Sequence, residues 1–322
     1  MKTSDCNLRK KFAWLAVFLL ISYVIPWCLV LIKKLEYGTY GEALALYMMI
    51  LPTIGVLTAD AVTKELKDHI VFRIYVCVFA LTSFAIILVI LNIISVESFE
   101  IMFEVISFIS SITVLGYCLM NDGIYLNFKP FQFVVMMSGM VAICIIPVFC
   151  LEHKGTIETV LLSAQCLFYY PFISVIFNGI TLFGEEYCWR GRLLLKLSAR
   201  FGRRAGTILI GIIWELWHIP LWFVLYNAQS QSGTIIVFAL CRFATTISIG
   251  IFLSYVYFQT SSVWCCCIIH GLYDVIAQTY IFENLKYTIN SGLLVSSLVF
   301  VFFIFSKHFK DNSHIQGDKI EE

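Results

Sequence analysis

The chain has 322 residues, of which 60% are hydrophobic and only 13% are charged, and its mean hydropathy is +0.87. Soluble domains carry about 25% charged and roughly 45–50% apolar residues, so this composition excludes an ordinary soluble protein and indicates a polytopic membrane protein. The formal net charge of +1 and the lack of a long basic tract argue against a nucleic-acid partner.

Apolar runs long enough to cross a bilayer follow one another along the chain and predict an all-α membrane bundle of about eight to ten transmembrane helices. The basic N-terminus leads into the first run, which we interpret as a retained helix and not a cleaved signal peptide. The sixth run contains Pro171 and is expected either to continue helically through the glutamates that follow it or to form two elements. The runs are residues 12–32, 42–61, 70–95, 101–120, 131–151, 157–184, 205–226, 233–258, 262–282 and 288–306.

The polar chemistry is concentrated after residue 180, which suggests a division of the chain. We expect N-terminal transmembrane helices over residues 1–156, a core that carries the chemistry over 157–306, and a disordered cytoplasmic tail over 307–322. The most basic loop is 192–204, which fixes topology and could also hold anionic lipid headgroups. The positive-inside rule then predicts a multi-pass plasma-membrane protein with both termini in the cytoplasm.

The segment 184–192, GEEYCWRGR, places two adjacent carboxylates and an arginine beside a long apolar run. On a helix, Glu186 and Arg190 face each other, with the acid on the N-terminal side. Glu185 then points about 100° away. Ionisable groups at bilayer depth cost roughly 2.5–3.5 kcal/mol each, so the cluster indicates function. The alternative is a charged helix end at the membrane surface.

Two histidines lie inside later apolar runs, His218 in WELWHIP and His270 in CCCIIHGLYD. His270 and Asp274 are four residues apart and share a helix face, so the carboxylate could orient the imidazole. Trp214 and His218 have the same spacing, and the indole can shield the imidazole from water. Three spans thus supply a carboxylate pair, a histidine and a His–Asp pair, which suffice to activate water and stabilise an oxyanion.

Other motifs narrow the chemistry. The chain lacks GxSxG and a Ser–Lys pattern, so attack by water is preferred over an acyl-enzyme, and it lacks HExxH. Glu215 is predicted to form a structural pair with Arg242 of the next span. The run Cys265–Cys267 precedes His270, but three consecutive helical residues point in three directions, which disfavours a metal site. Asp60 is one of few charges in the first five helices and is expected near a helix end.

Three motifs resemble those of the CAAX-protease and bacteriocin-processing family, also called CPBP or Abi, of intramembrane endopeptidases. The resemblance covers roughly residues 160–306, and the ordered set is specific although each motif alone is weak. The motifs read Glu185-Glu186-xxx-Arg190, Trp214-xxx-His218 and His270-xxx-Asp274.

The resemblance implies roles for these residues. Glu185 would be the catalytic base that acts with His218 on the attacking water, and His270 would stabilise the oxyanion. Glu186 and Arg190 would hold the glutamate helix in place, with a share in catalysis for Glu186 as the alternative.

Asp274 departs from the eukaryotic-type pattern, which has Asn at this position. An ionised Asp cannot donate to an oxyanion, so Asp274 is either protonated or acts only by orienting His270. Two glutamates and two histidines are also a set that could bind zinc, whereas the glutamate-peptidase interpretation needs no ion.

The family implies a bacterial intramembrane endopeptidase that cuts a small peptide or a membrane-associated protein. Its bacterial relatives are associated with pheromone processing, bacteriocin self-immunity and surface-protein display. One alternative is a non-enzymatic immunity or scaffold protein on the same fold, which would tolerate loss of Glu185 or His218. A second is a transporter with a proton relay, which predicts repeats with paired broken helices that the sequence does not display.

Overall fold

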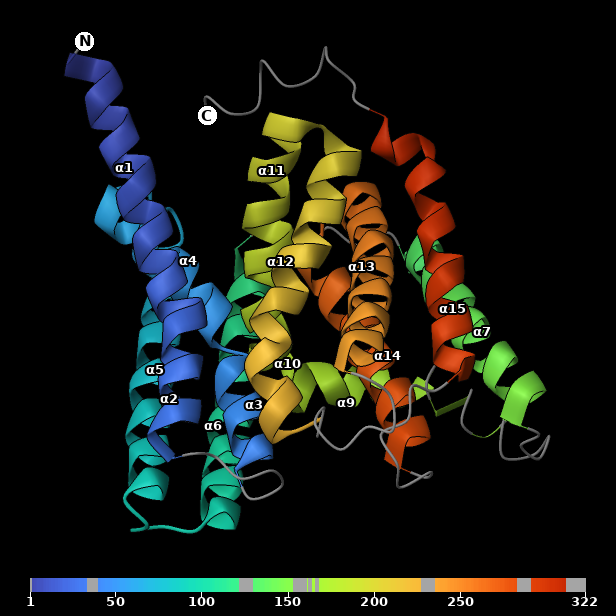
Figure 1. Cartoon of the computed structure of the whole chain (residues 1–322), viewed down its shortest axis with the longest axis horizontal. Coiled ribbons are helices and arrows are strands. Elements are labelled where there is room, and N and C mark those ends of the chain that lie inside the picture. The colour runs from blue at the N-terminus through green and yellow to red at the C-terminus, as the bar shows by residue number, and fades with distance from the viewer. Residues whose placement is uncertain are drawn as a thin grey trace.

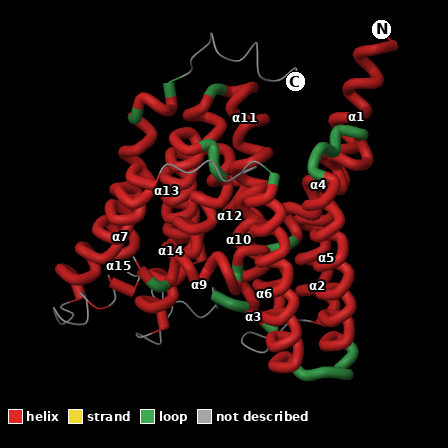
Figure 2. Tube along the Cα trace, turned by 180° about the vertical axis from the view of Figure 1, so that it is seen from behind, coloured by secondary structure: helices red, strands yellow, loops and turns green. Residues whose placement is uncertain are grey.

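A computed structural model gives the arrangement of the chain. It describes residues 2–33, 40–121, 130–152, 161, 164–165, 168–226, 235–282 and 291–310. Over these ranges the regular elements are helices, without a strand (Figures 1 and 2). The predicted all-α membrane bundle is therefore confirmed.

The N-terminal half is built from six helices within the described ranges, and four stretches of it are long and apolar enough to cross a membrane. These stretches are Arg9–Ile32, Gly41–Thr63, His69–Ile90 and Val96–Met120, and they confirm the first four predicted runs. A π-helical turn, Leu20–Val24, joins the first two helices. The helices are α1 (Lys2–Leu19), α2 (Ile25–Lys33), α3 (Gly41–Met48), α4 (Leu51–Thr63), α5 (His69–Ile90) and α6 (Val96–Met120).

The C-terminal half mixes long and short helices. Arg203–Val224 and Ile235–Thr260 can span a membrane, and shorter apolar stretches occur at Pro130–Ile146, Val263–Ala277 and Val295–Phe305. The chain is thus a multi-pass membrane protein. The elements are α7 (Pro130–Glu152), α9 (Tyr170–Phe177), α10 (Gly179–Glu186), the π-helix η2 (Tyr187–Leu193), α11 (Leu194–Phe201), α12 (Arg203–Val224), α13 (Ile235–Thr260), α14 (Val263–Phe282) and α15 (Ser291–Val301).

The sixth predicted run is divided, as the second alternative had it. Helix α9 begins next to Pro171 and ends before Asn178, whose backbone leaves the helical region (φ −115°, ψ 12°). A new helix start leaves backbone N–H groups without intrahelical acceptors. Ser111 of α6 satisfies one of them, because its Oγ accepts a hydrogen bond from Ile180 N at 2.8 Å. The break therefore lets α10 change direction near the middle of the bundle.

Side chains of the N-terminal half form hydrogen bonds with backbone carbonyls of α10. Tyr75 of α5 donates from its hydroxyl to the carbonyl of Ile180 at 2.6 Å, and Thr53 of α4 donates to the carbonyl of Phe183 at 3.4 Å. At Gly184 the approach is closest, since a Cβ added there would lie 2.4 Å from the carbonyl oxygen of Met49. Helix α10 is thus held on its main chain, which leaves its glutamate side chains free for other partners.

Asp60 lies near the end of α4, as expected, but it is fully buried. Its Oδ1 accepts a hydrogen bond from Trp14 Nε1 of α1 at 2.7 Å and lies 3.7 Å from Lys196 Nζ. Its Oδ2 accepts a hydrogen bond from Arg192 in η2. Burial lowers the pKa of the Lys196 amine, and Asp60 partly offsets this. Asp60 therefore ties the first helices to the element that follows the glutamates. The predicted boundary at residue 156 lies outside the described residues.

The predicted tail begins too early. Lys307–Phe309 forms a 3₁₀ turn, and Phe309 is buried with its ring edge-on to that of Phe258 at 5.5 Å. Arg203 donates from Nη1 to the carbonyl of His308 at 2.8 Å, which fixes the turn. The start of α1, α11 and the end of α15 lie at one end of the bundle (Figure 1). Residues 311–322 lie outside the described residues.

Candidate functional site

Glu185 and Glu186 are the last two residues of α10, and both are buried. The chain continues without a break into the π-helix η2, which contains Arg190. Each π-turn is wider than an α-helical turn, and such turns are frequent at functional sites. The motif thus folds as one continuous helix, but its second half is wound differently from the first.

Glu186 is the meeting point of two helices. Arg190 donates from Nη1 to Glu186 Oε1 at 2.6 Å, and both side chains are completely buried, so the predicted pair is confirmed. His270 Nδ1 of α14 lies 2.9 Å from the same oxygen. This second contact is not predicted by the sequence, because spacing along one helix carries no information about a partner on another. One buried carboxylate therefore joins the arginine and the histidine.

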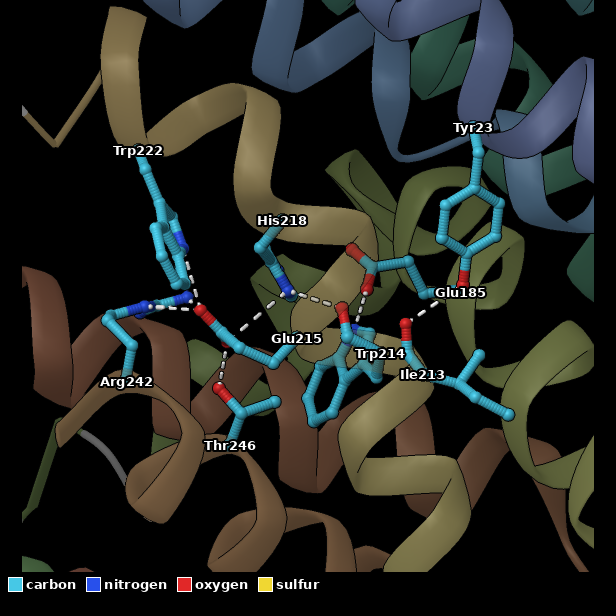
Figure 3. Close-up of polar contacts among 9 residues, drawn as sticks. All are labelled: Tyr23, Glu185, Ile213, Trp214, Glu215, His218, Trp222, Arg242 and Thr246. Atoms are coloured by element: carbon cyan, nitrogen blue, oxygen red, sulfur yellow. Dashed lines mark hydrogen bonds and ion pairs between the residues drawn. The ribbon is translucent and has the colours of Figure 1, made fainter. Parts of the chain in front are cut away.

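Glu185 turns the other way and pairs with an aromatic residue of α12. Its Oε2 accepts a hydrogen bond from Trp214 Nε1 at 2.8 Å, and the Glu185 residue is only 3% exposed. The carboxylate is therefore oriented by an indole and not by a cation. The indole holds one of its two oxygens (Figure 3).

Trp214 connects the other members of the site. Its ring meets that of His270 edge-on, with centroids 5.1 Å apart and planes at 88°, and the guanidinium carbon of Arg190 lies 4.4 Å above it. The ring also packs beside His218, at 5.5 Å between centroids, as predicted. Trp217 covers the His218 imidazole from another direction at 4.7 Å. The three motifs thus meet at one indole.

His218 is held in one tautomer by its own helix. Its Nδ1 lies 2.9 Å from the carbonyl oxygen of Trp214, and because a carbonyl only accepts, Nδ1 carries the hydrogen. Nε2 is then the nitrogen with a lone pair, as a general base requires. The His218 side chain is 14% exposed, compared with 5% for His270.

His270 lies between two carboxylates. Its Nε2 is 3.6 Å from Asp274 Oδ2, too far for a hydrogen bond, while Nδ1 contacts Glu186. The Asp274 side chain is 36% exposed, so it meets His270 from the more open side. The shared helix face of His270 and Asp274 is confirmed. The imidazole is oriented chiefly by the buried glutamate.

The predicted Glu215–Arg242 pair is also confirmed, and it has further partners (Figure 3). Arg242 donates from Nε to Glu215 Oε1 at 2.9 Å and from Nη2 to Oε2 at 3.0 Å. Trp222 Nε1 donates to Oε1 at 2.8 Å, and the Thr246 hydroxyl donates to Oε2. The sequence does not predict these last two, since neither residue type identifies itself as a carboxylate donor.

Metal ligation was raised by the histidines, glutamates and cysteines. Within the described ranges, no group of three or more His, Cys, Asp or Glu side chains is placed to hold a metal ion. The thiols of Cys265–Cys267 are fully buried, and Cys266 Sγ lies 3.6 Å from the carbonyl of Leu253. Dependence of the activity on a metal is therefore a matter to test with a chelator.

The fold and the site define a polytopic membrane protein with a buried glutamate–histidine centre. Residues 165–276, which contain all three motifs, match the family model described as type II CAAX prenyl endopeptidase Rce1-like. This match supports the resemblance to the CAAX-protease family that the three motifs predict.

Comparison with individual proteins covers less of the chain. It is 43% identical over 47 residues to CAAX prenyl protease 2 of Methanococcus maripaludis. This match covers 15% of the chain and 17% of that relative. No solved structure matches the chain.

Proposed function

We propose that the chain is an intramembrane endopeptidase that hydrolyses peptide bonds with water activated by glutamate and histidine. The observation that carries this proposal is the contact of one indole with all three motifs. Trp214 donates to Glu185, accepts from His218 through its carbonyl, and packs against His270. Trp214 thereby brings together three buried or half-buried groups: the Glu185 carboxylate, the His218 imidazole with its free Nε2, and the His270 imidazole.

The chemistry follows from these groups. A water held between Glu185 and His218 Nε2 gives up a proton to this pair, and its oxygen bonds to the carbonyl carbon of the scissile peptide. His270, with carboxylates beside both ring nitrogens, acts as an imidazolium, and its Nε2–H donates to the oxyanion that develops. The C–N bond then breaks, and the proton taken from water passes to the leaving amine nitrogen. Asp274 orients His270 from the open side.

We further infer the setting of the reaction. The partners are the lipid bilayer and a small peptide or membrane-associated protein, of which a prenylated CAAX protein is one class. Basic residues lie at the start of α1, in α11 and in the turn Lys307–Phe309 that follows α15. These three parts share one end of the bundle (Figure 1), which supports a cytoplasmic location of both termini. A bacterial plasma membrane remains the proposed location.

The test compares wild type, Glu185→Ala and His218→Ala, purified in detergent, on a quenched peptide library that includes a farnesylated CAAX peptide. The matched control is Glu97→Ala, which removes an exposed carboxylate on α6. We expect wild type and the control to cleave, and both site variants to lose about 10³-fold or more in kcat at equal folded yield. A chelator should leave wild-type cleavage unchanged if no ion takes part.

Other outcomes would redirect the proposal. Equal cleavage by all four proteins would contradict the catalytic assignment, and the absence of cleavage by any of them would favour a non-enzymatic immunity or scaffold role. Loss of cleavage on chelation, restored by zinc, would contradict the metal-free mechanism while leaving the protease in place.

A further inference from the structure

We propose that Glu215, one of the three unspecified positions between Trp214 and His218, is a positioning residue for His218. The proposal rests on the proposed function for its catalytic consequence and on the geometry of α12 and α13 for its structural one. In it, the Glu215 carboxylate is a fixed negative charge beside the imidazole, aimed by groups that do not touch the substrate. The sequence alone favours a purely structural pair.

The carboxylate of Glu215 is fully buried and completely surrounded by donors. Trp222 and Arg242 Nε share Oε1, while Arg242 Nη2 and the Thr246 hydroxyl share Oε2. A carboxylate has about four acceptor positions, and an ionised carboxylate is an acceptor only, so the site matches an ionised group with every position filled. The group is therefore unable to rotate without breaking several hydrogen bonds.

The direction of this carboxylate is the informative feature. Residues three apart on a helix are neighbours, yet their side chains can point apart. Here the donors from α13 and from the next turns of α12 direct Glu215 so that Oε2 lies 3.8 Å from His218 Nδ1. Arg242 and His218 approach the carboxylate from opposite sides (Figure 3). The anion is thus the charged group between the arginine and the imidazole.

This arrangement suits a histidine that becomes positively charged during the reaction. Nδ1 already carries a hydrogen, bonded to the Trp214 carbonyl, so a proton taken by Nε2 makes the ring a cation. The positive charge then develops beside Glu215, which is already in place and needs no reorganisation. Arg242 balances the carboxylate before the proton arrives. An ion pair that only holds α12 and α13 together would not require the Glu215 carboxylate to face His218.

The first experiment separates the effect of the Glu215 charge on His218 from the contribution of the Glu215–Arg242 pair to stability. Glu215→Gln/Arg242→Met removes both charges together. The Gln amide oxygen can accept from Trp222, and the Thr246 hydroxyl can accept a hydrogen bond from the amide NH2. Replacing a whole buried ion pair is often neutral for stability, whereas removing one partner is not. Arg242→Lys, which keeps the carboxylate paired with a cation, is the conservative control.

We expect the double variant to melt near the wild-type temperature and to lose about 10- to 100-fold in kcat with an unchanged KM, as for groups that orient a catalytic residue. Arg242→Lys should retain most of the wild-type kcat. A structural pair without a role in positioning would leave kcat per folded molecule unchanged in the double variant, whatever its melting temperature, and that result would overturn the proposal.

A second measurement needs no peptide substrate. Diethyl pyrocarbonate acylates neutral imidazole, and mass spectrometry of the digested protein gives the rate at His218 relative to the exposed His69 of the same chain. At pH 8 we expect this ratio to be several-fold lower in the double variant than in wild type, because the adjacent anion favours attack by the imidazole. An unchanged ratio would overturn the proposal.

The two measurements distinguish the two proposals. If wild type cuts no peptide while the labelling ratio still falls in the double variant, Glu215 positions His218 and the endopeptidase assignment is the one that fails. If wild type cuts and kcat is unchanged in the double variant, the endopeptidase stands and the role of Glu215 is contradicted.

Discussion

The two halves of the molecule treat their buried polar groups differently. In α10, α12 and α14 they contact each other, as in the Glu186 contacts with Arg190 and His270. In the N-terminal helices several of them reach across to the main chain of α9 and α10: Ser107 donates to the carbonyl of Phe177 at 2.7 Å, and Tyr75 to that of Ile180. Asp60 is the exception described above, since its partners are side chains.

This difference indicates which helices carry the polar groups of the site and which helices position them. Contacts to main-chain atoms fix where a helix lies without consuming its side chains. The segment that matches the family model therefore contains the residues of the proposed site, while helices before residue 165 hold the glutamate helix in position. Variants in the two halves should consequently fail in different ways, and the predictions below test that contrast.

The largest effect is expected inside the family segment, from Arg190→Leu. This variant leaves Glu186 buried without its cation, which costs about 3–5 kcal/mol when one partner of a buried pair is removed. Thermal unfolding in detergent should show a large loss of stability or no folded protein. Arg200→Leu, at an exposed position of α11, is the control and should be nearly neutral. Equal melting temperatures for the two variants would mean that the pair does not hold the site together.

A smaller effect is expected at the contact between the halves, from Gly184→Ala. The new Cβ would lie 2.4 Å from the Met49 carbonyl oxygen, so α10 must move away from α4, at about 1–3 kcal/mol. Gly116→Ala in α6 is the matched control, because a Cβ there meets no atom within 4 Å among the described residues. The control should be neutral or stabilised by up to about 1 kcal/mol, since alanine favours helix.

Measuring kcat as well as stability shows whether the contact at Gly184 also positions Glu185. Movement of α10 displaces Glu185, so Gly184→Ala should also lower kcat per folded molecule, whereas Gly116→Ala should not. A loss of stability at Gly184→Ala with a wild-type kcat would show that the N-terminal half stabilises the site segment without positioning it.

Sequence reasoning was most successful within single helices. Hydrophobic length predicted the six stretches of the described residues that can span a membrane, and the four-residue spacing predicted the Glu186–Arg190 pair and the packing of Trp214 beside His218. The Glu215–Arg242 pair, although it joins two helices, could also be predicted, because opposite charges inside a membrane need each other.

Contacts between helices were mostly beyond prediction. Whether Glu185 or Glu186 meets His270 depends on how α10 and α14 are rotated, and the π-helical winding of η2 changes that rotation. Asp60 was expected at a helix end, but its burial depends on α1 and α11 closing over it. Such facts arise from packing, which a single sequence encodes only through many weak contacts.

The smallest effect is expected from Asp60→Asn, which weakens the link between the N-terminal half and η2. The Arg192 and Lys196 side chains are 21% and 45% exposed, so water can replace part of what they lose, and we expect a cost of about 1–2 kcal/mol. Trp14 still has an oxygen to donate to. Glu65→Gln, at an exposed position five residues later, is the control and should be neutral.

The kcat of Asp60→Asn decides what this link does. Arg192 lies in the same π-helix as Arg190, so a weaker contact between Asp60 and Arg192 should let this helix and the glutamates shift slightly. We expect kcat to fall by up to about tenfold, because small misplacements are costly in a preorganised site. A fall in both stability and kcat would extend the positioning role of the N-terminal half to the far end of η2. A fall in stability alone would confine that role to the contacts along α10, since η2 would then tolerate movement that α10 does not.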